Sequence, residues 1–396
     1  MSSLIVEVCE VAEVTPHPNA DRMAVAKIKG WYVCVAKDAV TGEPWCKAGD
    51  KVVYFPPDAV LQPEVSDKHG VTKYLGLLPK NEDGTRPPGG RVMVANLRGF
   101  KSYGFASPPD DPTWPVGTDV ADHYKVTKYE PPLKANQGDA ERPHAAFHRY
   151  YDMENIRNFL DVFTDGEEVV CTEKIHGENC RLGLIRDTND KGEAVWKWTA
   201  GTHDVRRKQF WQKQDADGNP VGDVKTSAPW MCFNDNIRQL LADLSGCGYD
   251  PAEIDKEPLV KNDMGYNVVL FGERFGCVQD MHYGFSNGGF GFRAFDVTVN
   301  GNYLDYDTKK AMFAKAGVEM VPEVYRGPYS FAKIEELAEG PTLVTDKPGK
   351  HTFREGVVVL SVKERAAITE KKVMSRAQLK CISFAYLSRK EGTEFH

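Results

Sequence analysis

The chain lacks the features that would place it in a membrane or outside the cell. Its 396 residues contain no uninterrupted apolar run of transmembrane length. The start, MSSLIVEVCEVAEV, has neither the basic segment nor the cleavage site of a signal peptide. The nine cysteines form no CxxC pair and no regular pairing pattern, so we expect reduced and mostly buried thiols. Together these absences predict a cytoplasmic or nuclear protein with no membrane association.

An excess of positive charge is also lacking. The sequence has 50 Lys and Arg against 57 Asp and Glu, a formal net charge of -7 at pH 7. Proteins that coat nucleic acid without sequence preference are usually basic. Any contact with nucleic acid must therefore be local and formed by a few clustered Lys and Arg residues.

What the chain does contain is typical of a folded protein of two or three domains, with 41% hydrophobic and 27% charged residues. Residues 1–120 consist of short alternating segments separated by Gly and Pro, which predict a small all-β barrel or sandwich. Residues 121–148 are polar and Pro-containing and read as a linker. Residues 149–396 mix strands with helices at 234–246 and 307–317, each closed by a glycine, and predict an α+β domain.

The most informative short stretch is CTEKIHGENCRLG, residues 171–183, in which Lys174 stands beside a glycine turn. Taken alone, an ordinary surface lysine before a β-turn explains it equally well. Four more segments follow in order: FGERFG (271–276), FRAFDV (292–297), REGVVV (354–359) and RAQLKCIS (376–383). Each alone has an ordinary explanation, such as a solvated acidic residue or a core aromatic. The ordered set does not.

This ordered set resembles the covalent nucleotidyltransferase superfamily of polynucleotide ligases and capping enzymes. EKIHGEN is similar to the RNA ligase 2 type, which has His where DNA ligases and capping enzymes have Asp. VTKYEPP, YDMENIRN, FGERFGCVQDMHYG and LKCISFAYL extend the resemblance over essentially the whole chain, to RNA ligases of the Deinococcus/Naegleria type. That resemblance implies an N-terminal OB-type β-barrel. It also implies a nucleotidyltransferase domain (ATP-grasp-like DNA/RNA ligase adenylation domain) of antiparallel sheets with flanking helices.

The resemblance implies an ATP-dependent RNA ligase that joins 3′-OH and 5′-phosphate ends through a lysyl-AMP intermediate and an RNA-adenylate. Its cofactors would be ATP and Mg²⁺ or Mn²⁺, and its substrate a nick in duplex RNA or an RNA-containing duplex. We expect a monomer. A DNA ligase or a capping enzyme is an alternative, against which His176, Glu173 and the expected lack of a C-terminal OB domain all argue. A non-catalytic RNA-binding protein built on the OB domain is another.

The chemistry explains why these residue types are needed. An amine attacks phosphorus only when it is unprotonated, whereas a free lysine is almost fully charged at neutral pH. Neighbouring cations would favour the neutral amine and offset the phosphate charge. A divalent ion would bridge the triphosphate and stabilise the transition state. Gly177 permits a close backbone approach that a Cβ would obstruct.

The resemblance also implies a role for each site residue. Lys174 would carry AMP, Glu173 would read the adenine amino group, His176 and Asn179 would act at the phosphate in later steps, Glu273 would hold a ribose hydroxyl, Phe292 would stack on adenine, Glu355 would lie beside the metal ion, and Lys380 would contact the α-phosphate. Phe295 is equally well placed for stacking. The segment AGTHDVRRKQF offers Thr202 and His203, of which we assign His203 to the nucleotide.

The last motif leaves one phosphate contact open. Many family members have two lysines, two residues apart, in the last motif, but Gln378 and Ile382 flank Lys380 at that spacing. Arg376, Lys371 or Lys372 could supply the missing phosphate contact.

The N-terminal VTPHPNADRM and LRGFKSYGFA resemble OB domains that bind tRNA and other RNAs. Pro16 to Asn19 form either a turn between strands or an RNA contact. Aromatic residues of this region could stack on bases, although most aromatics of a small barrel lie in the core. They are Trp31, Tyr32, Phe55, Phe100 and Tyr103.

Overall fold

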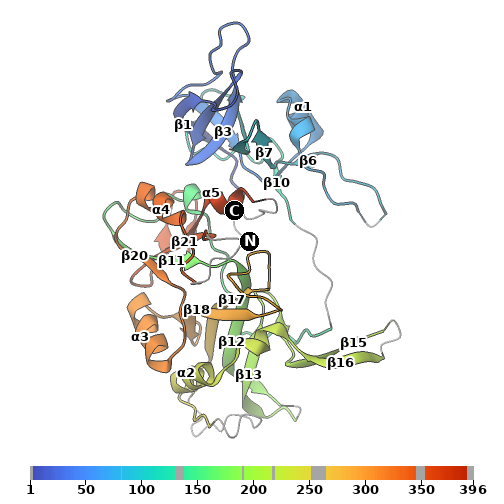
Figure 1. Ribbon diagram of the computed structural model, residues 1–396, viewed down its shortest axis with the longest axis vertical. Coiled ribbons are helices and arrows are strands. Elements are labelled where there is room, and N and C mark those ends of the chain that lie inside the picture. Colours follow the sequence, from blue (N-terminus) through green and yellow to red (C-terminus); the bar gives the residue numbers. More distant parts are fainter. Residues whose placement is uncertain are drawn as a thin grey trace. The chain divides into compact units, whose positions relative to one another are not determined.

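The computed structural model of the chain is drawn in Figure 1. It describes residues 3–81, 83–130, 138–189, 191–215, 219–250, 265–344 and 353–389. These residues divide into two compact units. The first takes in Met1–Lys134, Glu154–Phe159 and Leu387–His396, and the second Ala135–Met153 and Leu160–Tyr386.

The first unit is built mainly of strands. Its five-stranded sheet has the order β3 (Trp31–Ala36), β2 (Met23–Ile28), β1 (Glu7–Pro16), β4 (Lys51–Phe55), β9 (Phe105–Ser107). The smaller elements are β10 (Thr127–Lys128), β5 (Ala59–Leu61) and β6 (Gly90–Arg91) in one sheet, β7 (Val94–Leu97) and β8 (Phe100–Tyr103) in another, the helix α1 (Pro63–Lys68) and the short helices η1 (Thr72–Tyr74) and η2 (Ile156–Asn158). The strand content that the alternating segments predicted is confirmed.

The core of this unit explains why apolar and polar residues alternate along its strands. Inward-facing apolar side chains such as Val8, Val53 and Leu61 pack together with Phe55, whose ring stacks on Phe105 at 4.5 Å between centroids. The same core includes Val120, the last residue of the predicted β domain, and also Tyr124 and Val126, which we assigned to the linker. The predicted domain boundaries stay a prediction, and the compact units differ from them at this point.

Residues 154–159 lie with the first unit although they follow the predicted linker. The Glu154 carboxylate accepts hydrogen bonds from the backbone N–H and the hydroxyl of Ser3. The guanidinium of Arg157 lies 4.7 Å from the centre of the buried Trp31 ring. YDMENIRN, one of the segments that carried the resemblance, therefore has a packing role.

The Pro16–Asn19 turn holds the β7–β8 hairpin. The Nδ1 atom of His17 accepts from the Asn19 N–H at 3.1 Å, so Nε2 carries the proton and donates to the Leu97 carbonyl, also at 3.1 Å. Asn19 Nδ2 donates to the Arg98 carbonyl at 3.0 Å. The turn is thus used for hairpin packing.

The candidate stacking aromatics of this unit fall into two groups. Trp31, Phe55 and Tyr103 are buried. Tyr32 and Phe100 remain partly exposed.

The second unit contains two antiparallel sheets. The four-stranded sheet has the order β20 (Glu323–Pro328), β11 (Glu168–Lys174), β21 (Gly356–Ser361), β24 (Gln378–Ile382). The six-stranded sheet has the order β14 (Arg206–Arg207), β13 (Ala194–Gly201), β12 (Gly177–Thr188), β17 (Val268–Gly276), β18 (Phe290–Val299), β19 (Asn302–Tyr303). Two hairpins complete the strands: β15 (Phe210–Gln214) pairs with β16 (Pro220–Thr226), and β22 (Ala367–Ile368) pairs with β23 (Val373–Met374). The β15–β16 hairpin extends away from the six-stranded sheet in Figure 1.

The described part of the second unit has few helices, and capping residues mark some of their ends. They are η3 (Ala228–Cys232), α2 (Asp235–Ser245), α3 (Tyr306–Ala316), α4 (Phe331–Ala338) and α5 (Phe384–Leu387). The Asn234 side chain accepts from the Ile237 N–H at 2.9 Å and caps α2. Gly246 and Gly317, both with positive φ, end α2 and α3 as the sequence predicted. The mixed, sheet-rich α+β class is confirmed.

The six-stranded sheet has two differently covered faces. Leu182, Leu184 and Leu270 lie on the face that α2 and α3 cover, which we call the helix face. Alternate residues point the other way, where Phe271 packs against residues including Tyr150; we call this the aromatic face. Residues of β17 thus point in turn to two separate environments.

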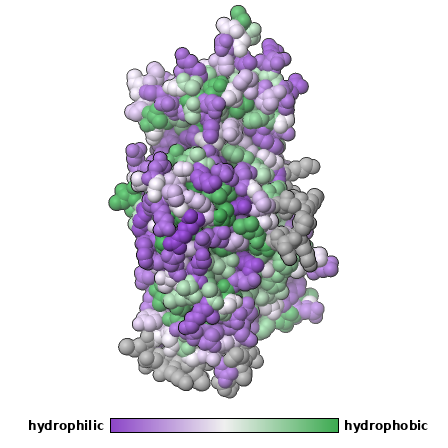
Figure 2. All heavy atoms as spheres, turned by 60° about the vertical axis from the view of Figure 1, so that its left-hand side comes forward, coloured by the Kyte–Doolittle hydropathy of each residue, from purple (hydrophilic) through white to green (hydrophobic). Residues whose placement is uncertain are grey.

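Within the described residues, no helix is long and apolar enough to cross a membrane. On the face drawn in Figure 2, hydrophobic residues lie scattered among hydrophilic ones. All nine cysteines are free thiols and most are buried, as predicted.

Candidate active site

Lys174 is the last residue of β11, and it lies beside Glu355. The register pairs Lys174 with Gly356, the first residue of β21, so Glu355 comes directly before the paired position. Lys174 Nζ lies 2.5 Å from Glu355 Oε1. The carboxylate side chain is fully buried, while the lysine side chain is 22% exposed. The structure therefore brings together two of the predicted catalytic residues, 181 positions apart.

Lys380 shares a sheet face with Lys174. Thr172 of β11 pairs with Val358 of β21, and Val358 pairs with Lys380 of β24, so these three side chains point to one side of the four-stranded sheet. Lys174 lies two residues after Thr172 on the same strand, so its side chain points to that side as well. The predicted pairing of both lysines with one nucleotide phosphate is compatible with this register.

Arg376, one of the candidates for the missing phosphate contact, is committed elsewhere. Its Nη1 donates to Asp296 Oδ2 at 2.6 Å and to the Tyr150 hydroxyl at 3.0 Å, and its Nε donates to Glu364 at 2.8 Å. The guanidinium also lies 3.7 Å from the centre of the Tyr303 ring. This buried network makes Arg376 a structural residue.

Glu173 points to the other side of β11. Its carboxylate accepts from the Thr342 hydroxyl at 2.5 Å and from the Leu343 N–H at 2.7 Å. Burial raises the pKa of the Glu173 carboxyl, and these hydrogen bonds and the charge of Arg354 offset part of the effect. A carboxylate has lone pairs beyond the two used here, so an adenine amino group could still donate to it.

Glu273 and Asn179 face each other across β17 and β12, on the aromatic face. Gly177 begins β12, and a Cβ there would overlap the Arg274 carbonyl oxygen and lie 3.1 Å from Glu273 Cγ. The backbone does approach this glycine closely, as expected, and the approaching group is the Arg274 carbonyl of the neighbouring strand β17.

Tyr283 stands among three of the predicted carboxylates. Its hydroxyl accepts from the His176 N–H at 2.7 Å. Burial raises the pKa of this hydroxyl, and the negative charges of Glu355, Glu173 and Glu273 raise it further. Carboxylates from three motifs therefore lie near enough to this buried hydroxyl to raise its pKa.

The His176 ring is held at both nitrogens. Nε2 lies 2.7 Å from Asp280 Oδ1, and Nδ1 lies 2.9 Å from the Tyr386 hydroxyl. Because a carboxylate only accepts, the neutral ring donates from Nε2 and accepts the Tyr386 proton at Nδ1. The ring is buried, whereas the Asp280 side chain is 36% exposed. Protein groups therefore fix the orientation of the His176 ring from both sides.

Sequence reasoning missed Asp280, Tyr283, Tyr386 and Thr342. The signal for three of them was present, since FGERFGCVQDMHYG contains Asp280 and Tyr283, and LKCISFAYL contains Tyr386. Those segments marked the resemblance without assigning a role to these residues. Thr342 lies in no quoted motif.

The structure does not bring Phe292 to Glu273. Phe292 pairs with Arg274 and packs against the core under α2, on the helix face. Phe295, the alternative that the sequence left open, contacts Tyr150 at 5.0 Å between ring centroids, in the cluster of Phe271 on the aromatic face. Stacking on adenine stays a prediction, and the geometry favours Phe295.

His203 also lies apart from the other predicted residues. Its Nδ1 contacts Asp204 at 3.0 Å and its Nε2 lies 3.9 Å from Asp152. Arg149 binds both of these carboxylates. These contacts place His203 in a partly exposed cluster of charged residues at the turn between β13 and β14.

The residues present fit a nucleotide with a divalent ion. Asn179 Oδ1 is buried and has no hydrogen-bond partner among the described residues, so an oxygen acceptor is available there. Glu355 and Glu273 supply carboxylates, the ligand type that Mg²⁺ and Mn²⁺ prefer. The described ranges contain no cluster of three or more His, Cys, Asp or Glu side chains that could hold a metal ion by themselves.

Comparison with known families decides what this arrangement belongs to. The profile of the RNA ligase family matches residues 167–382, more than half of the chain. The chain belongs to the RNA ligase family. The match runs from β11 to β24 and so spans Lys174, Glu273, Glu355 and Lys380. It confirms the family that the ordered motifs indicated.

Solved structures of an RNA ligase share the fold along the whole chain. A mutant of the Naegleria gruberi RNA ligase with AMP and Mn has a TM-score of 0.65 at 20% sequence identity, and the match covers 98% of this chain and 99% of that chain. The same enzyme with PPi gives 0.63 at 20% identity, covering 99% and 100%. A mutant with ATP and Mn gives 0.62, also at 20% identity, covering 97% and 98%. At this identity the likeness shows the fold alone.

A local match of another kind covers a small part of this RNA ligase family member. The phenylalanine–tRNA ligase beta subunit of Dehalococcoides mccartyi is 46% identical over 56 residues in one strain, and 45% in a second. The match covers 14% of this chain and 7% of those relatives' length. It links a short segment of the chain to a much longer protein.

Proposed function

We propose that this protein is an ATP-dependent RNA ligase that joins a 3′-OH end to a 5′-phosphate end through a lysyl-AMP intermediate on Lys174. The contact between Lys174 and the buried Glu355 carries this proposal, because it pairs an amine with a carboxylate at the meeting point of two motifs. Family membership supports the reaction class. The complexes of the Naegleria gruberi enzyme with ATP, AMP and Mn support ATP and a divalent ion as cofactors.

We also propose that residues 1–120 form an OB domain and that residues 149–396 form the nucleotidyltransferase domain, with residues 121–148 as the linker between them. The five-stranded order β3–β2–β1–β4–β9 supports the first assignment, and the two antiparallel sheets with flanking helices support the second. A monomer, seen as a single species of about 44 kDa in sedimentation, is the expected state.

The chain's own residues account for the first step. The Lys174 ammonium donates to Glu355 Oε1, so this carboxylate is in position to accept the proton that must leave before attack. The Nζ–phosphorus bond then forms as the bond from the α-phosphorus to the pyrophosphate oxygen breaks. Lys380, on the same sheet face, would balance charge on the α-phosphate. A divalent ion held near Glu355 would neutralise the triphosphate.

Labelled ATP tests this step without RNA. The wild-type protein, incubated with magnesium or manganese, should acquire a covalent label that survives denaturing gel electrophoresis and that Lys174→Ala abolishes. The matched control is Lys213→Ala on the exposed β15 strand, which should keep the full label. Absence of label on wild type, or undiminished label on Lys174→Ala, would exclude the mechanism.

The substrate preference is tested with four nicked duplexes. In these, the 3′-OH strand and the 5′-phosphate strand are each made of RNA or DNA independently. We expect sealing when the 3′-OH strand is RNA, because A-form shape and the 2′-hydroxyl distinguish RNA from DNA. ATP, GTP and dATP should be compared side by side. Sealing of the all-DNA nick would favour a DNA ligase, and use of GTP a capping-type enzyme. RNA binding without any lysyl-AMP would favour a non-catalytic RNA-binding protein.

A further inference from the structure

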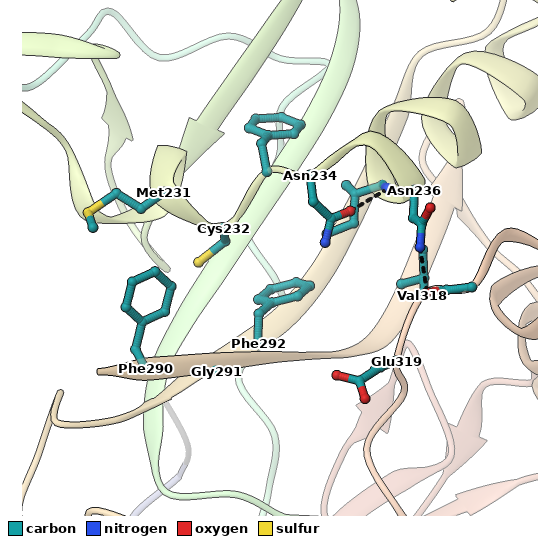
Figure 3. A pocket seen from close by; sticks show the side chains of 12 residues that line it. Met231, Cys232, Asn234, Asn236, Phe290, Gly291, Phe292, Val318 and Glu319 are labelled. Atoms are coloured by element: carbon teal, nitrogen blue, oxygen red, sulfur yellow. Dashed lines mark hydrogen bonds between the residues drawn. The ribbon is translucent and has the colours of Figure 1, made fainter. Parts of the chain in front are cut away.

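A pocket opens on the helix face of the six-stranded sheet, behind the strand that carries Glu273. Its volume is about 400 Å³. Its lining comes from η3 and the first turn of α2, from Phe290 to Phe292 of β18, and from Gly317 to Glu319 after α3 (Figure 3). Nothing in the proposed reaction uses it, because Glu273 and Asn179 point to the opposite face.

Aromatic rings form the walls of this pocket. Phe292 lies against Gly272, where a Cβ would overlap its ring, so the glycine gives the ring its place. Phe290 and Phe233 are packed against the core but only partly buried. Met231 is 49% exposed. Leaving such apolar surface open to water is unfavourable, which suggests that a flat apolar group covers it.

Polar groups stand at fixed places between these rings. Asn234 Oδ1 is used as the cap of α2, so its amide nitrogen turns toward Phe292, as Figure 3 shows. Asn236 Nδ2 donates to the Gly317 carbonyl at 3.0 Å, which leaves its oxygen as an acceptor. The carboxylate of Glu319 is paired with Arg293. The pocket thus offers a donor and acceptors beside its apolar walls.

The edge of β18 adds backbone groups to this set. Ala294 donates to the Glu319 carbonyl and accepts from the Val321 N–H, both at 2.9 Å, so its backbone points away from β17. Phe292 and Phe290 have the same parity along the strand and therefore point the same way. Among the described residues their outward N–H and C=O groups have no hydrogen-bond partner. This open edge is too short for the addition of a peptide strand, which needs several paired residues.

A positive charge lies beside the aromatic walls. The Arg274 guanidinium is 4.6 Å from the centre of the Phe290 ring. It contacts the Glu178 carboxylate only at 3.4 Å, and its buried Nε has no hydrogen-bond partner within the described part of the chain. Arg274 could therefore bind a phosphate that follows a group held on Phe290.

We propose that this pocket binds a single unstacked nucleobase of the RNA on which the enzyme acts. A base has two flat faces for the phenylalanines, a hydrogen-bonding edge for Asn234, Asn236 and the β18 backbone, and an adjoining phosphate for Arg274. The proposal rests on the proposed function, since it takes RNA as the substrate. It adds an RNA contact on the sheet face opposite to the candidate active site.

The test uses a single-stranded RNA with one 2-aminopurine, whose fluorescence reports stacking, and a nicked RNA duplex for sealing. Phe290→Ala should weaken binding of the probe by roughly tenfold, which is about 1.4 kcal/mol, and Met231→Ala by less. Phe290→Trp should retain binding because it keeps an aromatic face. The control Phe210→Ala, at a 59% exposed phenylalanine of β15, should bind as wild type does.

Labelling with ATP separates this proposal from the proposed function. If wild type forms no lysyl-AMP, the proposed function fails, and the binding comparison still judges the pocket. Unchanged RNA binding in both Phe290→Ala and Met231→Ala overturns the pocket proposal, whatever the labelling shows. So does a loss of lysyl-AMP that equals the loss of RNA binding, since the pocket would then support the nucleotide site. Circular dichroism checks that each variant is folded. If Phe290→Ala is unfolded, the result for Met231→Ala decides the test.

Discussion

The two partners of the His176 ring provide the sharpest test of the candidate active site. Asp280→Asn keeps an acceptor for Nε2 but removes the negative charge, and Tyr386→Phe removes the donor to Nδ1. Both changes preserve the size of the side chain. We predict that each slows the RNA-joining step, because each loosens the ring at one side while leaving Lys174 and its contact with Glu355 in place.

The expected magnitudes follow from the contacts. A hydrogen bond to a charged group is worth about 1.5–3 kcal/mol and a neutral one about 1 kcal/mol, so Asp280→Asn should lose about 1 kcal/mol, or roughly fivefold in rate. Tyr386→Phe leaves the buried Nδ1 without its donor, which costs about 1–3 kcal/mol. Because both act through one ring, the double variant should depart from additivity by at least about 0.5 kcal/mol.

The assay is single-turnover joining of a nicked RNA that already carries AMP on its 5′-phosphate, so that only the last step is measured. Asp223→Asn and Tyr74→Phe, at exposed positions, are the matched controls and should keep the wild-type rate. Two single effects that add within about 0.3 kcal/mol would refute the idea that Asp280 and Tyr386 act through His176. Unchanged rates in both single variants would remove the ring from the mechanism.

Three further predictions concern the frame of the site. Asp296→Asn should lower the free energy of unfolding by about 3–5 kcal/mol, because it removes the buried carboxylate that pairs with both the Lys309 ammonium and the Arg376 guanidinium. Burial would raise the pKa of the Asp296 carboxyl, but nearby positive charges outweigh it and lower the pKa. The contribution is therefore present above the unfolded-state pKa of about 3.9 and is lost as pH falls toward the lower folded-state pKa. Urea unfolding should show the difference in free energy of unfolding between wild type and Asp296→Asn narrowing below about pH 4; a difference that does not narrow would contradict this. Gly177→Ala should abolish labelling by ATP, since its Cβ meets backbone, whereas Gly248→Ala, with open space around it, should not; equal labelling would be the contrary result. Phe295→Ala should raise KM for ATP by roughly fivefold or more, and an effect confined to Phe292→Ala would reverse the preference stated above.

Local sequence patterns predicted the strand-rich first unit, the two glycine-terminated helices and the ordered motifs. These features depend on neighbouring residues: alternation fixes which side chains of a strand are buried, and an αL glycine ends a helix wherever it stands. Motif order and resemblance indicated Lys174, Glu273 and Glu355 as site residues. Lys174 lies beside Glu355 because the pairing of β11 with β21 sets Lys174 opposite Gly356, and the hydrophobic pattern of the strands fixes such a register.

Only the tertiary structure decided the contacts between distant segments. The sequence could not tell Phe292 from Phe295, because the two rings point to opposite faces of β18 and only the packing of the sheet shows which face carries Glu273. It also offered Arg376 for phosphate binding, whereas the fold buries that guanidinium against Asp296 and Tyr150.

The partners of the His176 ring were equally hidden, since they come from a loop and a short helix that lie 104 and 210 residues further along the chain. The sequence by itself determined which residues could do the chemistry of an RNA ligase. Strand register and the packing of loops, which depend on the whole chain at once, decided which of them meet.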